Sequence, residues 1–180
     1  MNKIALGIAS LLIGASGLIA PVAVSAEGSS GEALAADWDM VAFDVKSWGA
    51  PITSWRILSN GGGSWTETVR EKGTAFADYK LAWHEIDPTA ANYTVLESIL
   101  RQLPQPAPDA QACENFMTDA PYGTIRLTKG ATTIEIAWND GCLDDSYQAF
   151  MAVLRQADQH IQSIGKVAPV ARIESPAAGE

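Results

Sequence analysis

The chain has 180 residues, with 12 Lys and Arg against 21 Asp and Glu and a formal net charge of −9. The basic residues are scattered and form no stripe, which argues against binding of nucleic acid or of an anionic membrane surface. An acidic protein can instead attract a basic protein partner by long-range electrostatic steering. The composition therefore excludes two classes of anionic partner and leaves a basic one open.

The first residues of the chain have the features of a secretory signal peptide. Lys3 precedes an apolar run over 4–24, and Val24-Ser25-Ala26 leads into a polar segment. Small residues at −3 and −1 predict cleavage after Ala26, so that residues 1–26 form the signal peptide. The alternative is an uncleaved membrane anchor, because the run is nearly long enough to span a bilayer. Its glycines and proline weigh against that alternative.

Export determines the expected state of the two cysteines. In a periplasmic or extracellular space, which is oxidising, Cys113 and Cys142 are expected to form a disulfide. No later apolar stretch approaches spanning length, so no stable membrane span is expected after cleavage. Residues 27–36 are small and polar and are expected to be a flexible lead-in.

Three strands are predicted at the start of the folded domain. Residues 40–48 alternate apolar and polar side chains, the period of a half-buried strand. Residues 52–59 and 64–70 form the next two strands, joined through the glycine-rich loop 60–63.

The register of this first hairpin stays open, because glycine repeats specify strand pairing weakly. An even loop length opposes Arg56 to Glu67. An odd loop length instead gathers a set of apolar side chains on one face: Trp55, Ile57, Trp65 and Val69.

One segment of this region carries a resemblance. Trp48-Gly49-Ala50-Pro51, followed by Trp55 and the glycine-rich turn, resembles exported bacterial proteins of uncharacterised families with β-hairpin and helix repeats. The resemblance covers about half of the domain. It implies export and a repeat-type architecture, and it implies no activity.

A fourth strand and a first helix follow. Residues 76–86 alternate apolar side chains and are predicted to be a strand. Asp87 can cap a helix and Pro88 suits its first position. The stripe that follows has helical spacing and ends in a proline-rich linker: Leu96, Ile99, Leu100 and Leu103.

The clearest hairpin lies between the two cysteines. Residues 124–128 and 131–138 flank Lys129-Gly130, and a two-residue turn there pairs Ile125 with Ile134. Arg126 and Glu135 are then diagonal neighbours on the polar face. The apolar face collects Ile125, Leu127, Ile134, Ile136 and Trp138.

The last predicted element is an amphipathic helix. Asp145 and Gln148 have the spacing of a capping box, and an apolar stripe continues to about Gly165. Residues 166–180 are rich in Ala and Pro and are expected to be disordered.

These elements predict one α+β domain over 37–165, in the order ββββ-α-ββ-α. Two hairpins would form an antiparallel sheet, and both amphipathic helices would pack on one face of it. The other face of the sheet would be free of helices.

The search for catalytic chemistry yields one weak candidate, His84. Its neighbour Glu85 points to the opposite side of a strand, so a surface histidine at a sheet edge is the simpler interpretation. Neither His84 nor His160 has the partners of a metal site, and no cofactor motif is present. The oxygen-rich segment 139–145 lacks the spacing of a calcium loop and is interpreted as a turn with a helix cap.

The six tryptophans are the remaining feature, and they could fill the core or form an exposed aromatic strip. The leading hypothesis is an exported, non-enzymatic binding protein, with inhibition of a basic secreted or envelope enzyme as one role that fits its acidity. It would bind through the helix-free face or the loop after Ser59, with Trp55, Asn60, Trp65 and Trp83 as binding residues. The alternatives are a small hydrolase that uses His84 with a nearby carboxylate, and an envelope domain that binds glycan or lipid.

Overall fold

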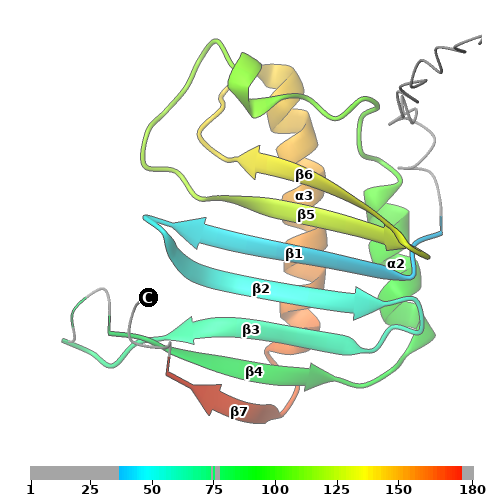
Figure 1. Ribbon diagram of the computed structural model, residues 1–180, viewed down its shortest axis with the longest axis vertical. Coiled ribbons are helices and arrows are strands. Elements are labelled where there is room, and N and C mark those ends of the chain that lie inside the picture. The colour runs from blue at the N-terminus through cyan, green and yellow to red at the C-terminus, as the bar shows by residue number, and fades with distance from the viewer. Residues whose placement is uncertain (1–36, 74, 76–77, 176–180) are drawn as a thin grey trace, which may run out of the picture.

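The computed structural model describes residues 37–73, 75 and 78–175, which form an antiparallel sheet with two long helices on one of its faces (Figure 1). The predicted signal peptide and lead-in lie outside the described residues. The elements in chain order are β1 Met40–Ser47, β2 Ala50–Leu58, β3 Gly63–Val69, β4 Lys80–Ile86, α2 Ala90–Leu100, the short 3-10 helix η1 Ala110–Ala112, β5 Tyr122–Lys129, β6 Thr132–Asn139, α3 Asp145–Gly165 and β7 Val170–Glu174.

The α+β prediction with the helices on one face is confirmed, but the number and order of the strands differ from the prediction. The described sheet has seven strands in the order β6-β5-β1-β2-β3-β4-β7. β1 lies between the two hairpins and pairs with β2 of the first and with β5 of the second, so both hairpins share one sheet.

The expectation of a disordered tail is wrong for residues 170–174, which form β7 and pair antiparallel with β4. The tail composition is typical of disorder, but β4 would otherwise present unpaired backbone N–H and C=O groups at the sheet edge. Residues 170–174 form hydrogen bonds with these groups of β4, and the composition of the tail gives no sign of that pairing. Residues 176–180 lie outside the described part.

The first hairpin adopts the odd-length alternative. Trp55 pairs with Trp65, and the last pair before the loop joins Ile57 to Gly63. This register turns both indoles and Ile57 toward the helices, where they are buried. Burial of that apolar set therefore selects between the two registers that the glycines leave open.

The second hairpin is shifted by two residues from the predicted register. Ile125 pairs with Ile136, and the turn is Gly130-Ala131, with Gly130 at a φ of 56°. A shift of two residues keeps every side chain on its face, so the predicted apolar and polar sets are correct. Arg126 and Glu135 are directly opposite each other, with 2.6 Å between Nε and Oε2.

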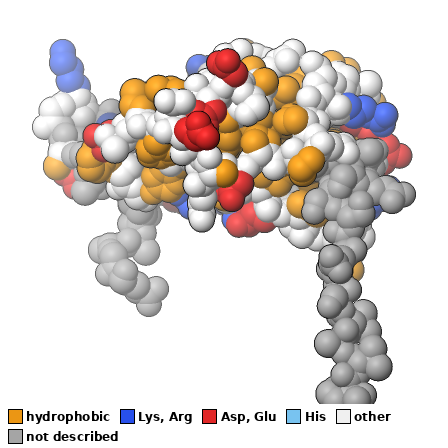
Figure 2. All heavy atoms as spheres, turned by 90° about the horizontal axis from the view of Figure 1, so that it is seen from above, with side chains coloured by type: hydrophobic (Ala, Val, Ile, Leu, Met, Phe, Trp, Pro, Cys, Tyr) orange, Lys and Arg blue, Asp and Glu red, His pale blue; other side chains and the backbone are white. Residues whose placement is uncertain are grey.

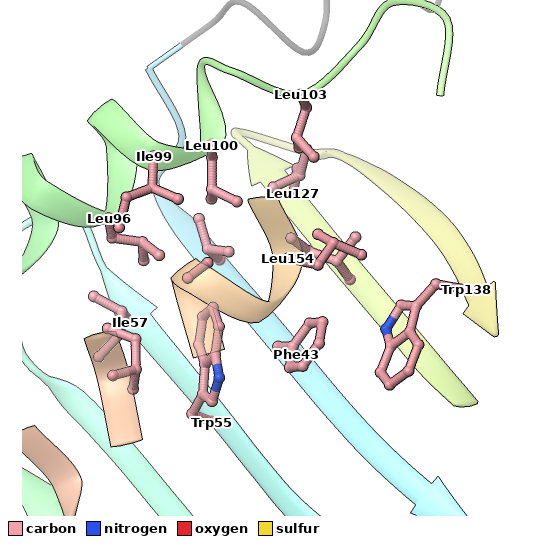
Figure 3. Close-up of a cluster of buried hydrophobic side chains, with 14 of the residues drawn as sticks. Phe43, Trp55, Ile57, Leu96, Ile99, Leu100, Leu103, Leu127, Trp138 and Leu154 are labelled. Carbon is pink, nitrogen blue, oxygen red and sulfur yellow. The ribbon is translucent and has the colours of Figure 1, made fainter. Parts of the chain in front are cut away.

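The core lies between the sheet and the helices (Figure 3). Phe43 of β1 stacks between Trp55 and Trp138, with ring centroids 5.4 and 5.2 Å away. Leu96 of α2 and Leu154 of α3 belong to the same buried cluster and are fully buried. Three strands and two helices thus contribute side chains to one core.

Both helices begin one or two residues from the predicted caps. Thr89, not Asp87, is the N-cap of α2, and Asp144, not Asp145, is the N-cap of α3. The capping box is wrong because Asp145 lies inside the first turn of α3 and the Gln148 side-chain amide donates to the Cys142 carbonyl oxygen at 2.5 Å. The Asp144 carboxylate accepts hydrogen bonds from the backbone N–H groups of Glu114 and Asn115 at 2.8 and 3.0 Å. The cap residue therefore ties a distant loop to the start of α3.

The predicted disulfide is confirmed: Cys113 and Cys142 are bonded, with their Cα atoms 5.7 Å apart. It lies beside the Asp144 contacts, so a covalent bond and three hydrogen bonds to Asp144 hold the same loop. None of the helices in the described residues is long and apolar enough to span a membrane.

Candidate functional site

Two of the predicted binding residues lie in the core. Trp55 is 3% exposed and Trp65 is 0% exposed, and both face the helices. The Trp55 indole N–H donates to the carboxylate of Asp158 on α3 at 2.9 Å, and Gly165 of α3 lies against the Trp65 ring. A partner could reach these indoles only if α3 were removed, which corrects the prediction that they form an exposed strip.

Asn60 and Trp83, the other two candidates, have different structural roles. Asn60 is exposed, but its side-chain oxygen accepts from the backbone N–H of Gly62 at 2.9 Å and so shapes the turn. Trp83 is half-buried on the helix-free face, where the Arg172 guanidinium lies 4.2 Å from its ring centroid. The four predicted residues do not form one site.

His84 is buried, at 6% exposure, and is not a surface histidine. Its Nδ1 lies 2.9 Å from the carbonyl oxygen of Ala168, in the connection to β7, and its ring lies 4.9 Å from that of Trp65. The nearby carboxylate is that of Glu67, 3.6 Å from Nε2, which is beyond hydrogen-bond distance. The chain segment that leads into β7 covers His84, which explains the wrong prediction of exposure.

Metal ligation has no support among the described residues. The one group of Cys, His and acidic residues with ligand atoms within 4.8 Å comprises Cys113, Cys142 and Asp144, and its two sulfurs are bonded to each other. Oxygens of the 139–145 segment face the protein: Asn139 accepts from the Gly141 N–H, and Asp140 pairs with Arg155 at 2.5 Å. His160 contacts the Asn92 carbonyl at 3.1 Å and joins the two helices.

A hollow of about 200 Å³ opens elsewhere, beside the β1–β2 turn. The start of β5, the end of β6 and the loop between η1 and β5 meet the turn at this point. We call it the aromatic hollow, and its lining residues are Trp48, Phe116, Asp119, Ala120, Tyr122 and Asn139.

Trp48 is the least expected residue of the aromatic hollow. Trp48 and Gly49 form a two-residue turn with φ values of 53° and 79°, the arrangement in which Asn and Gly are favoured. A bulky side chain at positive φ is uncommon and costs on the order of 1–3 kcal/mol. The indole is 72% exposed, so burial does not offset that cost.

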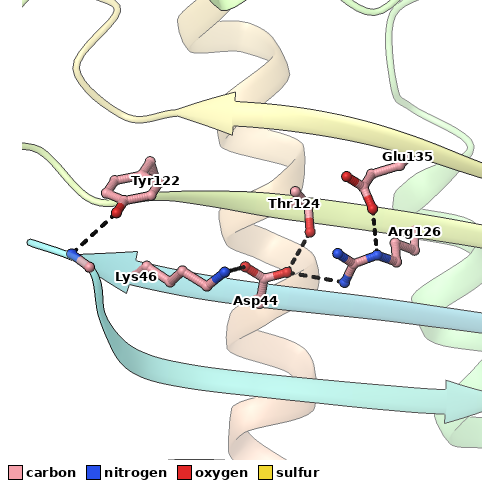
Figure 4. Close-up of polar contacts among 7 residues, drawn as sticks. Asp44, Lys46, Tyr122, Thr124, Arg126 and Glu135 are labelled. Atoms are coloured by element: carbon pink, nitrogen blue, oxygen red, sulfur yellow. Dashed lines mark hydrogen bonds and ion pairs between the residues drawn. The ribbon is translucent and has the colours of Figure 1, made fainter. Parts of the chain in front are cut away.

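Hydrogen bonds, a β-bridge and the disulfide connect the segments that surround the hollow. The Tyr122 hydroxyl accepts a hydrogen bond from the Gly49 backbone N–H at 3.2 Å, which links the turn to β5 (Figure 4). Phe116 forms an isolated β-bridge with Cys142, and the Met117 N–H donates to the Gly141 carbonyl at 2.7 Å. The disulfide and the Asp144 contacts hold the preceding residues of the same loop. The backbone segments that carry Trp48, Phe116 and Tyr122 are thus connected to one another at the surface.

Charges on the adjoining helix-free face are satisfied among themselves (Figure 4). Asp44 accepts from Thr124 and from Arg126, and Lys46 Nζ lies 3.6 Å from its other oxygen. Arg126 also pairs with Glu135. Lys46 pairs in register with Tyr122, but its ammonium group is directed toward Asp44 and does not line the hollow.

Asp119 is the one formally charged residue among the described residues that line the hollow. Its φ is 67°, and its carboxylate has no hydrogen bond or ion pair within the described part of the chain. The side-chain oxygen of Asn139 accepts from Gly141, whereas its NH₂ group has no acceptor among the described residues. The hollow therefore combines aromatic rings, one free carboxylate and few free hydrogen-bonding groups.

Sequence reasoning missed this site because it treated the six tryptophans as one group. The available signal was local: Trp48-Gly49 separates two apolar strand patterns by two residues, and a bulky aromatic residue is unusual in such a turn. Asp119 and Phe116 could not be found in this way, because a loop with no periodic pattern brings them to the turn.

Comparisons with known proteins add no further assignment: no protein-family model, no curated protein and no solved structure matches the chain.

Proposed function

We propose that this chain is an exported, non-enzymatic binding protein whose recognition site is the aromatic hollow. The observation that carries the proposal is Trp48, a large apolar side chain that is exposed and held at a positive φ. Packing does not account for it and neither does the turn, which smaller residues fit better. Strained, exposed residues of this kind cluster at ligand sites.

The composition of the hollow supports the same function. Ligand sites are concave, mostly apolar or aromatic, and carry a small number of polar groups that orient the ligand. Phe116 and Tyr122 supply further rings, and Asp119 and Asn139 supply the polar groups. The disulfide beside the loop fits the expected oxidising compartment, in agreement with the predicted signal peptide.

The hydrolase alternative has weaker support. Acid–base catalysis needs a histidine within hydrogen-bond reach of a substrate. His84 is buried beneath the segment before β7, and its Nε2 lies 3.6 Å from the Glu67 carboxylate. A partner surface on the helix-free face is also less favoured, because two of its four predicted residues are buried.

The test is a thermal-shift screen of the protein without residues 1–26. The probes are neutral oligosaccharides, organic cations, organic anions and lysine-rich peptides, applied to the wild type, Trp48→Ala and Phe116→Ala. Leu58→Ala is the matched control, because Leu58 is an exposed apolar residue of β2 that does not line the hollow.

We expect one class of probe to raise the melting temperature of the wild type and of Leu58→Ala, and to have no effect on the two hollow variants. If every shift is equal in all four proteins, or if no probe gives a shift, the hollow is not a recognition site.

A further inference from the structure

We propose that the aromatic hollow binds an alkylated ammonium cation, a group of the trimethylammonium type. This inference rests on the proposed function, because it assigns a ligand class to that same hollow. The inference is based on the aromatic rings and the carboxylate that line the hollow, and on its shortage of free hydrogen-bond acceptors. The residues concerned are Trp48, Phe116, Tyr122 and Asp119.

The first step concerns the aromatic faces. None of the ring pairs found among the described residues includes Trp48, Phe116 or Tyr122, so their faces are not covered by another ring. The face of an aromatic ring carries partial negative charge and attracts a cation within about 6 Å of its centroid, most strongly for Trp. Rings grouped around a small hollow are the arrangement that recognises quaternary ammonium groups.

The second step concerns formal charge. Asp119 lines the hollow without a cationic partner, and none of the described residues that line it is Lys or Arg. Figure 2, which looks from above onto the side where β6 lies, shows acidic side chains among the hydrophobic ones. The net charge of −9 adds a long-range field of the same sign. The lining carboxylate and the net charge both favour a cationic ligand over an anionic one.

The third step distinguishes an alkylated cation from other candidates. A metal ion or a bare ammonium group needs several oxygen acceptors. The Tyr122 and Asn139 side-chain oxygens each already accept a backbone N–H, so Asp119 is the one described lining residue whose side-chain acceptors have no hydrogen bond. A sugar has many hydroxyl groups, and the hollow has too few free hydrogen-bond acceptors for them. An alkylated ammonium group has no N–H to satisfy and needs only charge and aromatic faces.

Two probes that share one shape test the charge directly. Choline and 3,3-dimethyl-1-butanol differ by the replacement of a positively charged nitrogen with carbon. We would titrate each into the isotopically labelled protein and follow two sets of signals by NMR. The indole N–H signal of Trp48 is assigned by its loss in Trp48→Phe, and the backbone amide signals of Gly49 and Tyr122 report on the hollow in every variant, including those without Trp48. Sodium chloride at matched ionic strength controls for screening.

The variants separate the contribution of Asp119 from that of overall charge. Asp119→Asn removes the lining charge, Trp48→Ala removes the main ring, and Glu85→Gln removes an exposed carboxylate of β4 that does not line the hollow. We expect saturable choline binding to the wild type and to Glu85→Gln, at least tenfold weaker binding to the other two variants, and at least tenfold weaker binding of the neutral analogue.

The outcomes also separate this inference from the proposed function. Equal binding of choline and its neutral analogue, or equal weakening by Glu85→Gln and Asp119→Asn, would overturn the cation assignment. If maltotriose binds in a Trp48-dependent way and choline does not, the cation assignment fails and the hollow remains a recognition site. If neither probe depends on Trp48, both proposals fail. If choline does bind, vesicles with choline headgroups, compared with free choline, show whether the protein binds the cation on a lipid surface or in solution.

Discussion

Trp65 and Trp48 differ in how far the fold buries their side chains. Trp65 of β3 is 0% exposed and lies between His84 and α3, whereas Trp48 in the β1–β2 turn is 72% exposed. Burial of apolar surface explains the first indole without reference to function. The second gains little from burial and sits at an unfavourable φ. The comparison shows which tryptophan the fold requires and which one it only tolerates.

The two regions are also held together differently. Between sheet and helices, stacked rings and aliphatic side chains supply the cohesion, as Phe43 does between Trp55 and Trp138. Around the hollow, a disulfide and directed hydrogen bonds position the loop. Changes in the first region should therefore alter stability, and changes in the second should alter local order and binding.

The largest expected effect is that of Trp65→Ala. Removing a fully buried indole leaves a cavity against α3 and should lower the free energy of unfolding by about 3–5 kcal/mol. Urea denaturation followed by far-UV circular dichroism measures it. A loss below about 1 kcal/mol would mean that the site collapses around the change and that Trp65 is not a main element of the core.

Loss of the disulfide should have the next largest effect. Cys113 and Cys142 are separated by 29 positions, and opening a loop of that length should lower stability by roughly 3–4 kcal/mol in the chain-entropy model. The double variant Cys113→Ser/Cys142→Ser should melt several degrees below the wild type, and reductant should lower only the wild type. Equal melting temperatures with and without reductant would contradict this role.

Asp158→Asn should change how stability depends on pH. Burial raises the pKa of the Asp158 carboxyl above its usual 3.8, and the hydrogen bond from Trp55 opposes that rise. The folded state therefore keeps a proton that the unfolded chain has released, so stability falls as pH rises from about 3.8 through the folded pKa. Asn keeps an acceptor for Trp55 and removes this decline. Denaturation at a series of pH values should show a higher stability of the variant at pH 7; parallel profiles would refute the assignment.

Asp144→Ala should act locally at the loop that borders the hollow. Hydrogen bonds from the Glu114 N–H and from Asn115 lower the pKa of the Asp144 carboxyl below 3.8, so its contribution is present above that pH and is lost as pH falls through the folded pKa. Amide hydrogen exchange at Glu114 and Asn115 should accelerate in the variant, with little change in α2. Unchanged protection of both amides would show that the disulfide alone orders the loop.

Patterns of local origin were predictable from the sequence, and those that depend on distant contacts were not. Alternation along the strands, the two amphipathic helices and the oxidised cysteines led to the correct α+β class and disulfide. The side-chain faces of the second hairpin were also correct, because its register error of two residues preserves them. The pairing of β7 with the edge of β4 had no compositional signal.

The site was harder to predict than the fold. Hydrophobicity alone does not say whether a tryptophan will be buried, and the sequence placed Trp55 and Trp65 among the candidates for exposure. Their burial follows from a register that the glycine-rich loop leaves undetermined. The aromatic hollow depends on an irregular loop that brings Phe116 and Asp119 to Trp48, and no periodicity encodes that approach.

The most direct test of the contrast between the two tryptophans is the stability of Trp48→Asn. Asn suits the positive φ of this turn position, and the exposed indole supplies little packing. Urea denaturation should give a free energy of unfolding equal to that of the wild type or higher by up to about 1 kcal/mol. A loss comparable with that expected for Trp65→Ala would show that Trp48 serves the fold, and would contradict its assignment to a recognition site.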